Sequence, residues 1–266
     1  MNSDNYHARK RFGQNFLHDQ NIIQRIVDSI NPQNHEYIIE IGPGKGALTF
    51  PLLNRVKKLN VIEIDKDLAA KLRTNIEDKN RLIIHEKDAL DLDFSIFNHT
   101  DLRIVGNLPY NISTPILFHL LKYRECIKDM TFMLQKEVVE RICANSGNKK
   151  YGRLSIMLQY YCDVESLFNV KPEAFIPIPK IESALVKLIP VSHPRHELLD
   201  HECLKIIVRE SFSQRRKTIR NALKKYLDES TIINAGIAPE NRAENLEVCD
   251  FITLANCYHR MKTNIL

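Results

Sequence analysis

The chain has 266 residues, 44% of them hydrophobic and 27% charged, so it is long enough to bury a core in one large and one small domain. No apolar run reaches membrane-spanning length and residues 1–14 are polar and basic, which argues against a signal peptide, so we expect a cytoplasmic monomer without membrane contact. The formal net charge of +5 permits a nucleic-acid partner, and six cysteines without a C-x-x-C pair favour reduced thiols and no metal.

Residues 6–17 form a basic arm with interleaved aromatic residues, which suits contact with nucleic acid and makes Arg11 a candidate RNA-binding residue. An arm that only packs on the core is the alternative. Asp19 can cap an amphipathic helix that we predict to run to about Ile30. The first strand is predicted over residues 37–41.

A glycine-rich loop, Gly42-Pro43-Gly44-Lys45-Gly46, follows this strand and precedes a helical pattern over residues 47–56. Strand, glycine loop and helix open a nucleotide-binding βαβ unit, where glycines let the backbone approach a ligand. Gly42 and Gly44 are therefore candidate cofactor contacts. The G-x-G-x-G spacing is not that of dinucleotide-binding loops, and Gly46 replaces the Ser or Thr of a phosphate loop, which disfavours NAD and ATP.

An acidic residue lies at or just beyond the end of each of the next two predicted strands. Glu63 lies in the strand 59–64, about twenty residues beyond the glycine loop, where an acid can accept from both ribose hydroxyls. A surface glutamate is the weaker alternative. After a predicted helix over residues 67–77, Asp88 follows the strand 81–85 and can accept from an adenine amine or only close a turn.

The motif Asn107-Leu108-Pro109-Tyr110 follows an apolar run, residues 102–105, that is typical of a buried parallel strand. Ligands of open α/β sheets bind at this end of the strands. Asn107 offers a side-chain oxygen, and Pro109 leaves Leu108 extended with its carbonyl able to accept. Tyr110 adds a ring face. Two acceptors beside a ring suit a flat substrate with an exocyclic amine, and the alternative is an ordinary strand-to-helix turn.

Residues 171–180 contain three prolines, which make a stiff loop that presents Phe175. Phe175 is a candidate for stacking on a substrate base, and closing the core is an equal alternative. Strands predicted over residues 164–170 and 182–189 flank this loop. The elements before them are, in chain order, a helix over 113–123, a strand over 129–135, a helix over 136–144 and a basic loop over 146–152.

Residues 190–201 are rich in Pro, His and charge, as in an interdomain linker, and their His spacing fits no zinc pattern. Beyond them we predict helices over 204–212, 214–226, 230–235 and 246–261. The second helix has cations on one broad face, which suits phosphate binding, with a solvated face as the alternative. The candidate RNA-binding residues of this helix and of the earlier basic loop are Arg153, Arg215, Arg216, Lys217 and Arg220.

These patterns predict a Rossmann-like α/β domain over residues 1–190, with an N-terminal arm over 1–18, and a small all-helical domain over 191–266. The ordered motifs resemble those of the ribosomal RNA adenine dimethyltransferases, most closely the small-subunit type, from Phe12 to Met261. The matching segments are Phe12–Leu17, Glu40–Thr49, Glu63–Asp65, Asn107–Ser113, Met133–Val138, Tyr151–Ser155, Phe175–Ser183 and Phe212–Leu223.

The resemblance implies a class I methyltransferase domain with S-adenosyl-L-methionine as methyl donor. It places the donor against six residues, with Glu63 on the ribose and Asp88 near the adenine amine. These are Asn15, Leu17, Gly42, Glu63, Asp88 and Asn107. The implied substrate is two adjacent adenines near the 3′ end of 16S rRNA, in the small ribosomal subunit or its precursor, each methylated twice at N6.

Three other functions remain open from the sequence. A methylase of DNA adenine or of large-subunit RNA would use the same pocket chemistry. A ribosome-assembly factor would act by binding, and this role can coexist with catalysis. A small-molecule methyltransferase would not need the basic helical tail.

Overall fold

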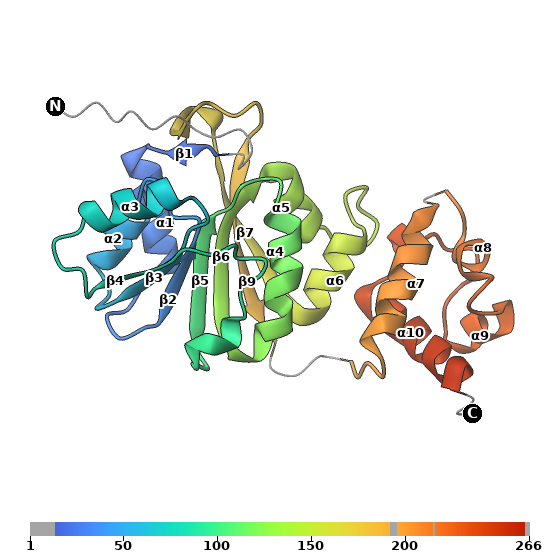
Figure 1. The fold of residues 1–266 in the computed structure, drawn as a ribbon. Coiled ribbons are helices and arrows are strands. Elements are labelled where there is room, and N and C mark those ends of the chain that lie inside the picture. Colours follow the sequence, from blue (N-terminus) through green and yellow to red (C-terminus); the bar gives the residue numbers. More distant parts are fainter. Residues whose placement is uncertain (1–13, 192–195, 215, 264–266) are drawn as a thin grey trace. The chain divides into compact units, whose positions relative to one another are not determined.

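A computed structural model describes residues 14–191, 196–214 and 216–263, and the chain forms two compact units (Figure 1). The first unit runs to Val139 and includes Glu165–Pro190, and the second consists of Glu140–Val164 and the chain from Val191 onward. Segment 140–164, which we assigned to the first domain, thus groups with the C-terminal helices. The domain boundary at residue 190 stays a prediction. No helix in the three described ranges is long and apolar enough to cross a membrane.

The first unit is built on a seven-stranded sheet with the order β4-β3-β2-β5-β6-β9-β7. Neighbouring strands from β4 to β6 are parallel, and β9 is antiparallel to β6. The strands are β2 (Ile38–Ile41), β3 (Leu59–Ile62), β4 (Leu82–His85), β5 (Leu102–Asn107), β6 (Ile127–Gln135), β7 (Cys162–Val170) and β9 (Ser183–Pro190). The strand order reverses between β2 and β5, and ligands of open α/β sheets bind at the carboxyl edge of such a switch point.

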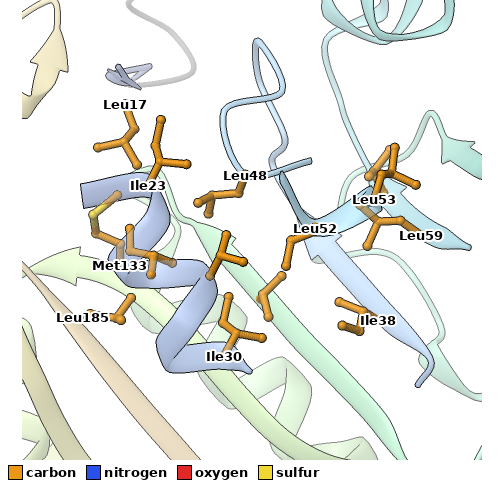
Figure 2. Packing of buried hydrophobic residues seen from close by; sticks show 14 of the residues in the cluster. Leu17, Ile23, Ile30, Ile38, Leu48, Leu52, Leu53, Leu59, Met133 and Leu185 are labelled. Carbon is orange, nitrogen blue, oxygen red and sulfur yellow. The ribbon is translucent and has the colours of Figure 1, made fainter. Parts of the chain in front are cut away.

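One core cluster joins this sheet to helices α1 (Gln20–Ile30), α2 (Thr49–Leu53) and α3 (Lys66–Thr74), and Figure 2 shows part of it. As predicted, α1 begins after Asp19, whose carboxylate accepts from the amides of Asn21 and Ile22. Its buried side chains recur every three or four residues, so one stripe of the helix faces the core. The remaining helical elements of this unit are η2 (Phe94–Phe97), α4 (Ser113–Leu120), η3 (Leu121–Cys126), the first residues of α5 (Lys136–Ile142) and η4 (Pro172–Ala174).

A separate two-stranded sheet pairs β1 (Phe16–Leu17) with β8 (Phe175–Ile176), and the sequence analysis did not predict it. Its register sets Leu17 opposite Phe175, and both side chains belong to the core cluster. Phe175 is only 1% exposed. The expectation that the proline-rich loop presents this ring is therefore wrong, because successive side chains of a strand point to opposite sides and β8 turns this one inward. The alternative, that Phe175 closes the core, is confirmed.

Arg103, in β5, is a charged residue whose side chain is buried, with only 5% of its surface exposed. It donates to both carboxylate oxygens of Asp129, at 2.9 and 2.8 Å, to Glu36 and to the carbonyl of Ile30 at 2.6 Å. Lys128 Nζ also donates to Glu36, at 2.8 Å. These bonds satisfy the charges that burial takes out of water, and they tie the end of α1 to β5 and β6.

The second unit contains helices that pack on one another. The helices are α6 (Arg153–Tyr161), α7 (His201–Ser213), α8 (Ile219–Leu223), α9 (Glu229–Asn234) and α10 (Val248–Thr263), with a short η5 (Ala243–Asn245). Helix α6, which we did not predict, packs against both α7 and α10. Its side chains from Ser155 to Leu158 are buried, which explains why segment 140–164 groups with the tail.

The prediction of one basic helix over residues 214–226 is wrong. Helix α7 ends at Ser213, and Gln214 leaves the helical conformation with φ −136° and ψ 81°. Thr218 is extended and forms an isolated bridge with Arg242, so α8 begins only at Ile219. Arg216 and Lys217 therefore lie on an exposed turn, not on a helix face. The buried side of the prediction is confirmed, because Ile219 and Leu223 are fully enclosed.

We expect Glu36→Gln to reduce the acid sensitivity of the fold. Burial raises the pKa of Glu36, but hydrogen bonds from Lys128, the Gln33 amide and Arg103 outweigh it and lower this pKa to about 2. A group whose pKa is lowered on folding stabilises the native state above its unfolded pKa, and this contribution is lost as the pH falls towards 2. The wild type should lose on the order of 1–2 kcal/mol more than the variant between pH 6 and pH 3.

Urea unfolding at pH 6, 4.5 and 3 measures this difference. Glu77→Gln is the control, since Glu77 is an exposed carboxyl of the same unit. Parallel stability curves for the wild type and Glu36→Gln would contradict the assignment.

Candidate active site

A cavity of about 310 Å³ lies at the carboxyl ends of the central strands, within the usual size of small-molecule sites, roughly 300–1,000 Å³. Its wall combines the segments that follow β2, β3, β4 and β5 with residues 14–17 at β1. Most of the wall is apolar, including Ile41, Leu48 and Leu68. Two carboxylates from neighbouring strands and one amide from β5 supply polar groups. A site of this kind suits a flat, partly apolar ligand that carries a few polar groups.

The glycine loop forms one side of the cavity. Gly42 and Gly44 have φ angles of 68° and 57°, a region that favours glycine. In this conformation the Gly44 amide donates to Oε2 of Glu63 at 3.1 Å. The hydrogen bond thus connects the loop after β2 to the end of β3, and the absence of a side chain at Gly42 and Gly44 lets a ligand approach the backbone there.

Glu63 is 4% exposed and lies on the cavity wall. Its Oε1 accepts from the Asp65 amide at 2.9 Å, so two backbone N–H groups hold the carboxylate in place. Burial is the largest influence on the pKa of Glu63 and raises it. A buried carboxylate that faces a cavity can accept from two vicinal hydroxyls, which is the role we predicted for it.

Glu40 is a second buried carboxyl on the wall, and our sequence analysis assigned it no role. Thr49 Oγ1 donates to Glu40 Oε2 at 2.6 Å. Burial and, to a smaller extent, the charge of Glu63 outweigh the Thr49 hydrogen bond and raise the pKa of Glu40 to about 8. Near pH 7 this group therefore holds a proton that a cationic ligand can displace. Its position at the end of β2, directly before the glycine loop, was the feature of the sequence that could have identified it.

Asn107 ends β5 with its side chain on the cavity wall. Its Nδ2 donates to the main-chain carbonyl of Asn15 at 3.1 Å. Because a carbonyl oxygen only accepts, the amide nitrogen must face Asn15, and Oδ1 is left as an acceptor. The amide of Leu108 donates to the Met133 carbonyl at 3.2 Å, which fixes the next peptide against β6.

Gly106 permits this corner to form. A Cβ at this position would meet the main-chain carbonyl oxygen of Ile41 at 2.4 Å, closer than real Cβ contacts. The close approach of β5 to β2 therefore depends on a residue without a side chain. Tyr110 follows two residues beyond Leu108, half-buried, and its hydroxyl shares a hydrogen bond of 2.8 Å with Ser183 Oγ. This hydrogen bond holds the Tyr110 ring at the cavity.

The structure brings ten of the predicted cofactor and catalytic residues to this one cavity. They are Asn15, Leu17, Gly42, Gly44, Glu63, Asp88, Asn107, Leu108, Pro109 and Tyr110. Phe175 does not line it. Asp88 closes a turn by accepting from the Leu90 amide at 2.9 Å and also lies on the wall, so both of its predicted features are present. The individual roles of these residues stay predictions.

The predicted RNA-binding residues that the structure describes belong to the second unit. Arg153 is exposed at the start of α6, and Arg216 and Lys217 are exposed on the turn before α8. Arg220 Nη1 donates to Glu229 at 2.8 Å, so its charge is partly neutralised. Arg11 and Arg215 lie outside the described residues.

Among the described residues, one group has the composition of a metal site: Asp200, Cys203 and His259, whose ligand atoms lie within 4.8 Å of one another. Asp200 caps α7, and the Cys203 thiol donates to it at 3.2 Å. Burial and this carboxylate raise the pKa of the thiol to about 11. The group is part of the second unit and does not line the cavity. All six cysteines are free thiols, as predicted.

The sheet has antiparallel β9 beside its parallel strands, a cavity at the switch point, and Glu63 directly after β3 on the wall of that cavity. These features define a class I S-adenosylmethionine-dependent methyltransferase. The crystal structure of a dimethyladenosine transferase from Plasmodium falciparum has a TM-score of 0.78 and 29% identity, covering 94% of this chain and 98% of that one. The 23S rRNA methyltransferase ErmE has a TM-score of 0.71 and 25% identity over 92% of this chain and 100% of its own.

Residues 5–260 match the family Ribosomal RNA adenine dimethylase. A relative from Pseudomonas fluorescens, named Ribosomal RNA small subunit methyltransferase A, is 52% identical over 251 residues, which cover 94% of this chain and 92% of the relative. The chain belongs to the ribosomal RNA adenine dimethylase family.

We expect binding of S-adenosyl-L-methionine to be coupled to loss of the Glu40 proton. A positive ligand in the cavity favours the carboxylate, so the pKa of Glu40 falls on binding from about 8, and affinity should rise with pH through that region. In Glu40→Gln this contribution is absent. The ratio of wild-type to variant affinity should increase by about 3- to 10-fold between pH 6.5 and 8.5, since one pKa unit corresponds to a factor of ten.

Isothermal titration at several pH values measures this ratio, and it cancels the titration of the ligand itself because both proteins receive the same ligand. Glutamine can still accept from Thr49, so the variant keeps the local hydrogen bond. A ratio that does not change with pH would show that Glu40 keeps its proton in the complex.

Proposed function

We propose that this protein transfers methyl groups from S-adenosyl-L-methionine to N6 of two adjacent adenosines near the 3′ end of 16S rRNA, giving N6,N6-dimethyladenosines. The substrate is the small ribosomal subunit or its precursor, and the protein takes part in subunit biogenesis as a cytoplasmic monomer. The observation that carries the proposal is that the glycine loop, Glu63 and residues 107–110 line one and the same cavity, in a chain of this family.

The donor fits the chemistry of this cavity. Its ribose hydroxyls can donate to Glu63, which lies on the cavity wall and whose carboxylate is held by the amides of Gly44 and Asp65. Its adenine amine can donate to Asp88, and the glycine loop leaves room beside the backbone. Glu40 supplies a second negative charge for a cationic ligand. When bound, the donor supplies an electrophilic methyl group on a positively charged sulfur.

Asn107 and Leu108 bias the adenine amine towards reaction. The N6 lone pair is delocalised into the ring, so the free amine is a poor nucleophile. Hydrogen bonds from N6 to Asn107 Oδ1 and to the Leu108 carbonyl favour a tetrahedral nitrogen whose lone pair is directed at the methyl group. The bond to Asn15 holds the amide in the required orientation before the base arrives. Direct displacement of this kind needs neither a metal nor a covalent enzyme intermediate.

The base must leave its RNA stack to reach this corner. Tyr110 offers one ring face, held by Ser183, and stacking on an aromatic ring is worth about 1–3 kcal/mol per base. The second transfer uses an amine that has lost one N–H. A corner with two acceptors tolerates this loss because one acceptor still binds the remaining N–H, and it therefore supports dimethylation.

The exposed cations of the second unit are suited to the RNA backbone. Arg216 and Lys217 lie on a turn, where their side chains can reach phosphates without a helix face to order them. Arg153 adds a cation at the start of α6.

We expect Asn107→Ala to lower turnover on unmethylated small subunits by roughly 10²–10³-fold, the usual effect of losing one aligned catalytic partner. Affinity for S-adenosyl-L-methionine should fall much less. Labelled-methyl transfer and titration calorimetry measure the two quantities. Asn54→Ala is the matched control, because Asn54 ends α2 and does not line the cavity. Full methylation by the Asn107 variant, mapped to the two adenines, would refute the role of this residue.

We expect the triple change of Arg215, Arg216 and Lys217 to Ala to weaken RNA binding and to flatten its dependence on salt. Each phosphate contact contributes roughly 0.7–0.9 to the slope of log affinity against log salt, so the slope should fall by about 2. Donor binding should be unchanged. Lys58→Ala, an exposed cation before β3, is the control. Equal slopes in the triple variant and the wild type would show that this turn does not contact RNA.

A further inference from the structure

The loop from Phe175 to Ser183 exposes isoleucines. Ile176 is 60% exposed, Ile178 65% and Ile181 43%, although the same segment buries Phe175 and Ser183. Elsewhere in the described residues of this unit, comparably exposed isoleucines occur one at a time, at Ile64, Ile83, Ile96 and Ile189. Exposed apolar side chains gathered in one short segment mark a surface that contacts a partner.

The loop is held rigidly at both ends, so these side chains cannot fold inward. At its start, Ile176 pairs with Phe16 in the β1–β8 sheet. At its end, Ser183 bonds to the Tyr110 hydroxyl at 2.8 Å, and the Lys136 amide donates to the Glu182 carbonyl at 2.9 Å. Pro177 and Pro179 fix the backbone between these anchors.

At each end, the residue that anchors the loop has a partner on the wall of the active-site cavity. Phe16, the backbone partner of Ile176, and Tyr110, the partner of Ser183, each line it. The isoleucines therefore project from a segment that is connected to two sides of the cavity into which the target base must enter.

The charges beside the isoleucines fit a nucleic acid. Lys180 is exposed on this loop, between Ile178 and Ile181 in the sequence, and Lys171 is exposed just before η4. Two acids, Glu173 and Glu182, are also exposed, and Glu182 is bonded to Lys136 at 2.5 Å. An apolar tip with cations on either side can contact stacked bases while the cations approach the phosphates on each side of them.

We propose that Ile176 and Ile178 form a wedge that occupies the space an adenine leaves in its RNA stack when it enters the cavity. The inference rests on the proposed function. Extrusion of a base removes its stacking with both neighbours, and aliphatic side chains inserted at a base step replace part of this contact. The wedge thereby holds the open RNA conformation, and Tyr110 receives the extruded base.

The test compares the wild type with Ile176→Ser/Ile178→Ser on two substrates. The first is the unmethylated small subunit. The second carries an abasic site next to a target adenine, which already removes one stacking partner. We expect the variant to lose about 10- to 100-fold in kcat/KM on the first substrate, the fold-change that corresponds to one base stack, and less than about 3-fold on the second. Its affinity for S-adenosyl-L-methionine should be unchanged.

Two further variants separate wedge action from loss of structure. Ile176→Leu/Ile178→Leu keeps the aliphatic volume and should restore most of the rate. Ile96→Ser removes an isoleucine of similar exposure, 54%, that does not line the cavity and should have no effect. Fluorescence of 2-aminopurine placed beside the target adenine should rise on binding of the wild type and less on binding of the serine variant.

Equal losses on both substrates, or no loss on either, would overturn the wedge. Failure of the proposed function is a different result, because then the wild type itself would not methylate the two adenines of the intact subunit.

Discussion

The hydrogen bond from Asn107 Nδ2 to the Asn15 carbonyl determines what the site can do. It joins the end of β5 to a residue 92 positions earlier in the chain. Only one orientation of the amide satisfies an acceptor-only partner, so the side-chain oxygen is directed before any substrate binds. Gly106 makes the bond possible, since any side chain there would push β5 away from Ile41 and displace the next residue. The chemistry of the corner thus depends on backbone contacts more than on the motif alone.

Two acids are buried side by side at the cavity of a chain that is basic overall. The protein has a formal net charge of +5, yet Glu40 and Glu63 are buried together at the cavity. Burial disfavours both carboxylates and raises the pKa of each. Without a ligand, the state in which Glu40 and Glu63 are both ionised is therefore disfavoured. A cationic ligand removes this penalty. The two buried acids therefore favour a cationic ligand in this cavity.

The sequence predicted the parts of the site that local patterns define. Strand ends followed by Gly, Pro, Asn or an acid indicated the glycine loop, Glu63 and the Asn107 corner, because these patterns report where a strand must stop. It failed where distant residues decide. Phe175 turned inward because β8 pairs with β1, and the helix over 214–226 broke because Thr218 bonds to Arg242 instead of continuing the helix. Arg103 fell inside the run 102–105 that we interpreted as apolar, and its burial could not be foreseen because its partners come from three other segments.

The β1–β8 pairing connects the surface of the site to its chemistry. Asn15, whose carbonyl holds the Asn107 amide, directly precedes Phe16, and Phe16 is paired with Ile176 of the exposed loop. Two residues of backbone thus separate the proposed RNA-contacting loop from the hydrogen-bond partner of Asn107. A loop that shifted on binding would move the amide away from its acceptor, whereas a rigid loop keeps it. The prolines and the buried Phe175 ring hold this segment in place, and with it the strand pairing next to Asn15 that positions the acceptor of Asn107.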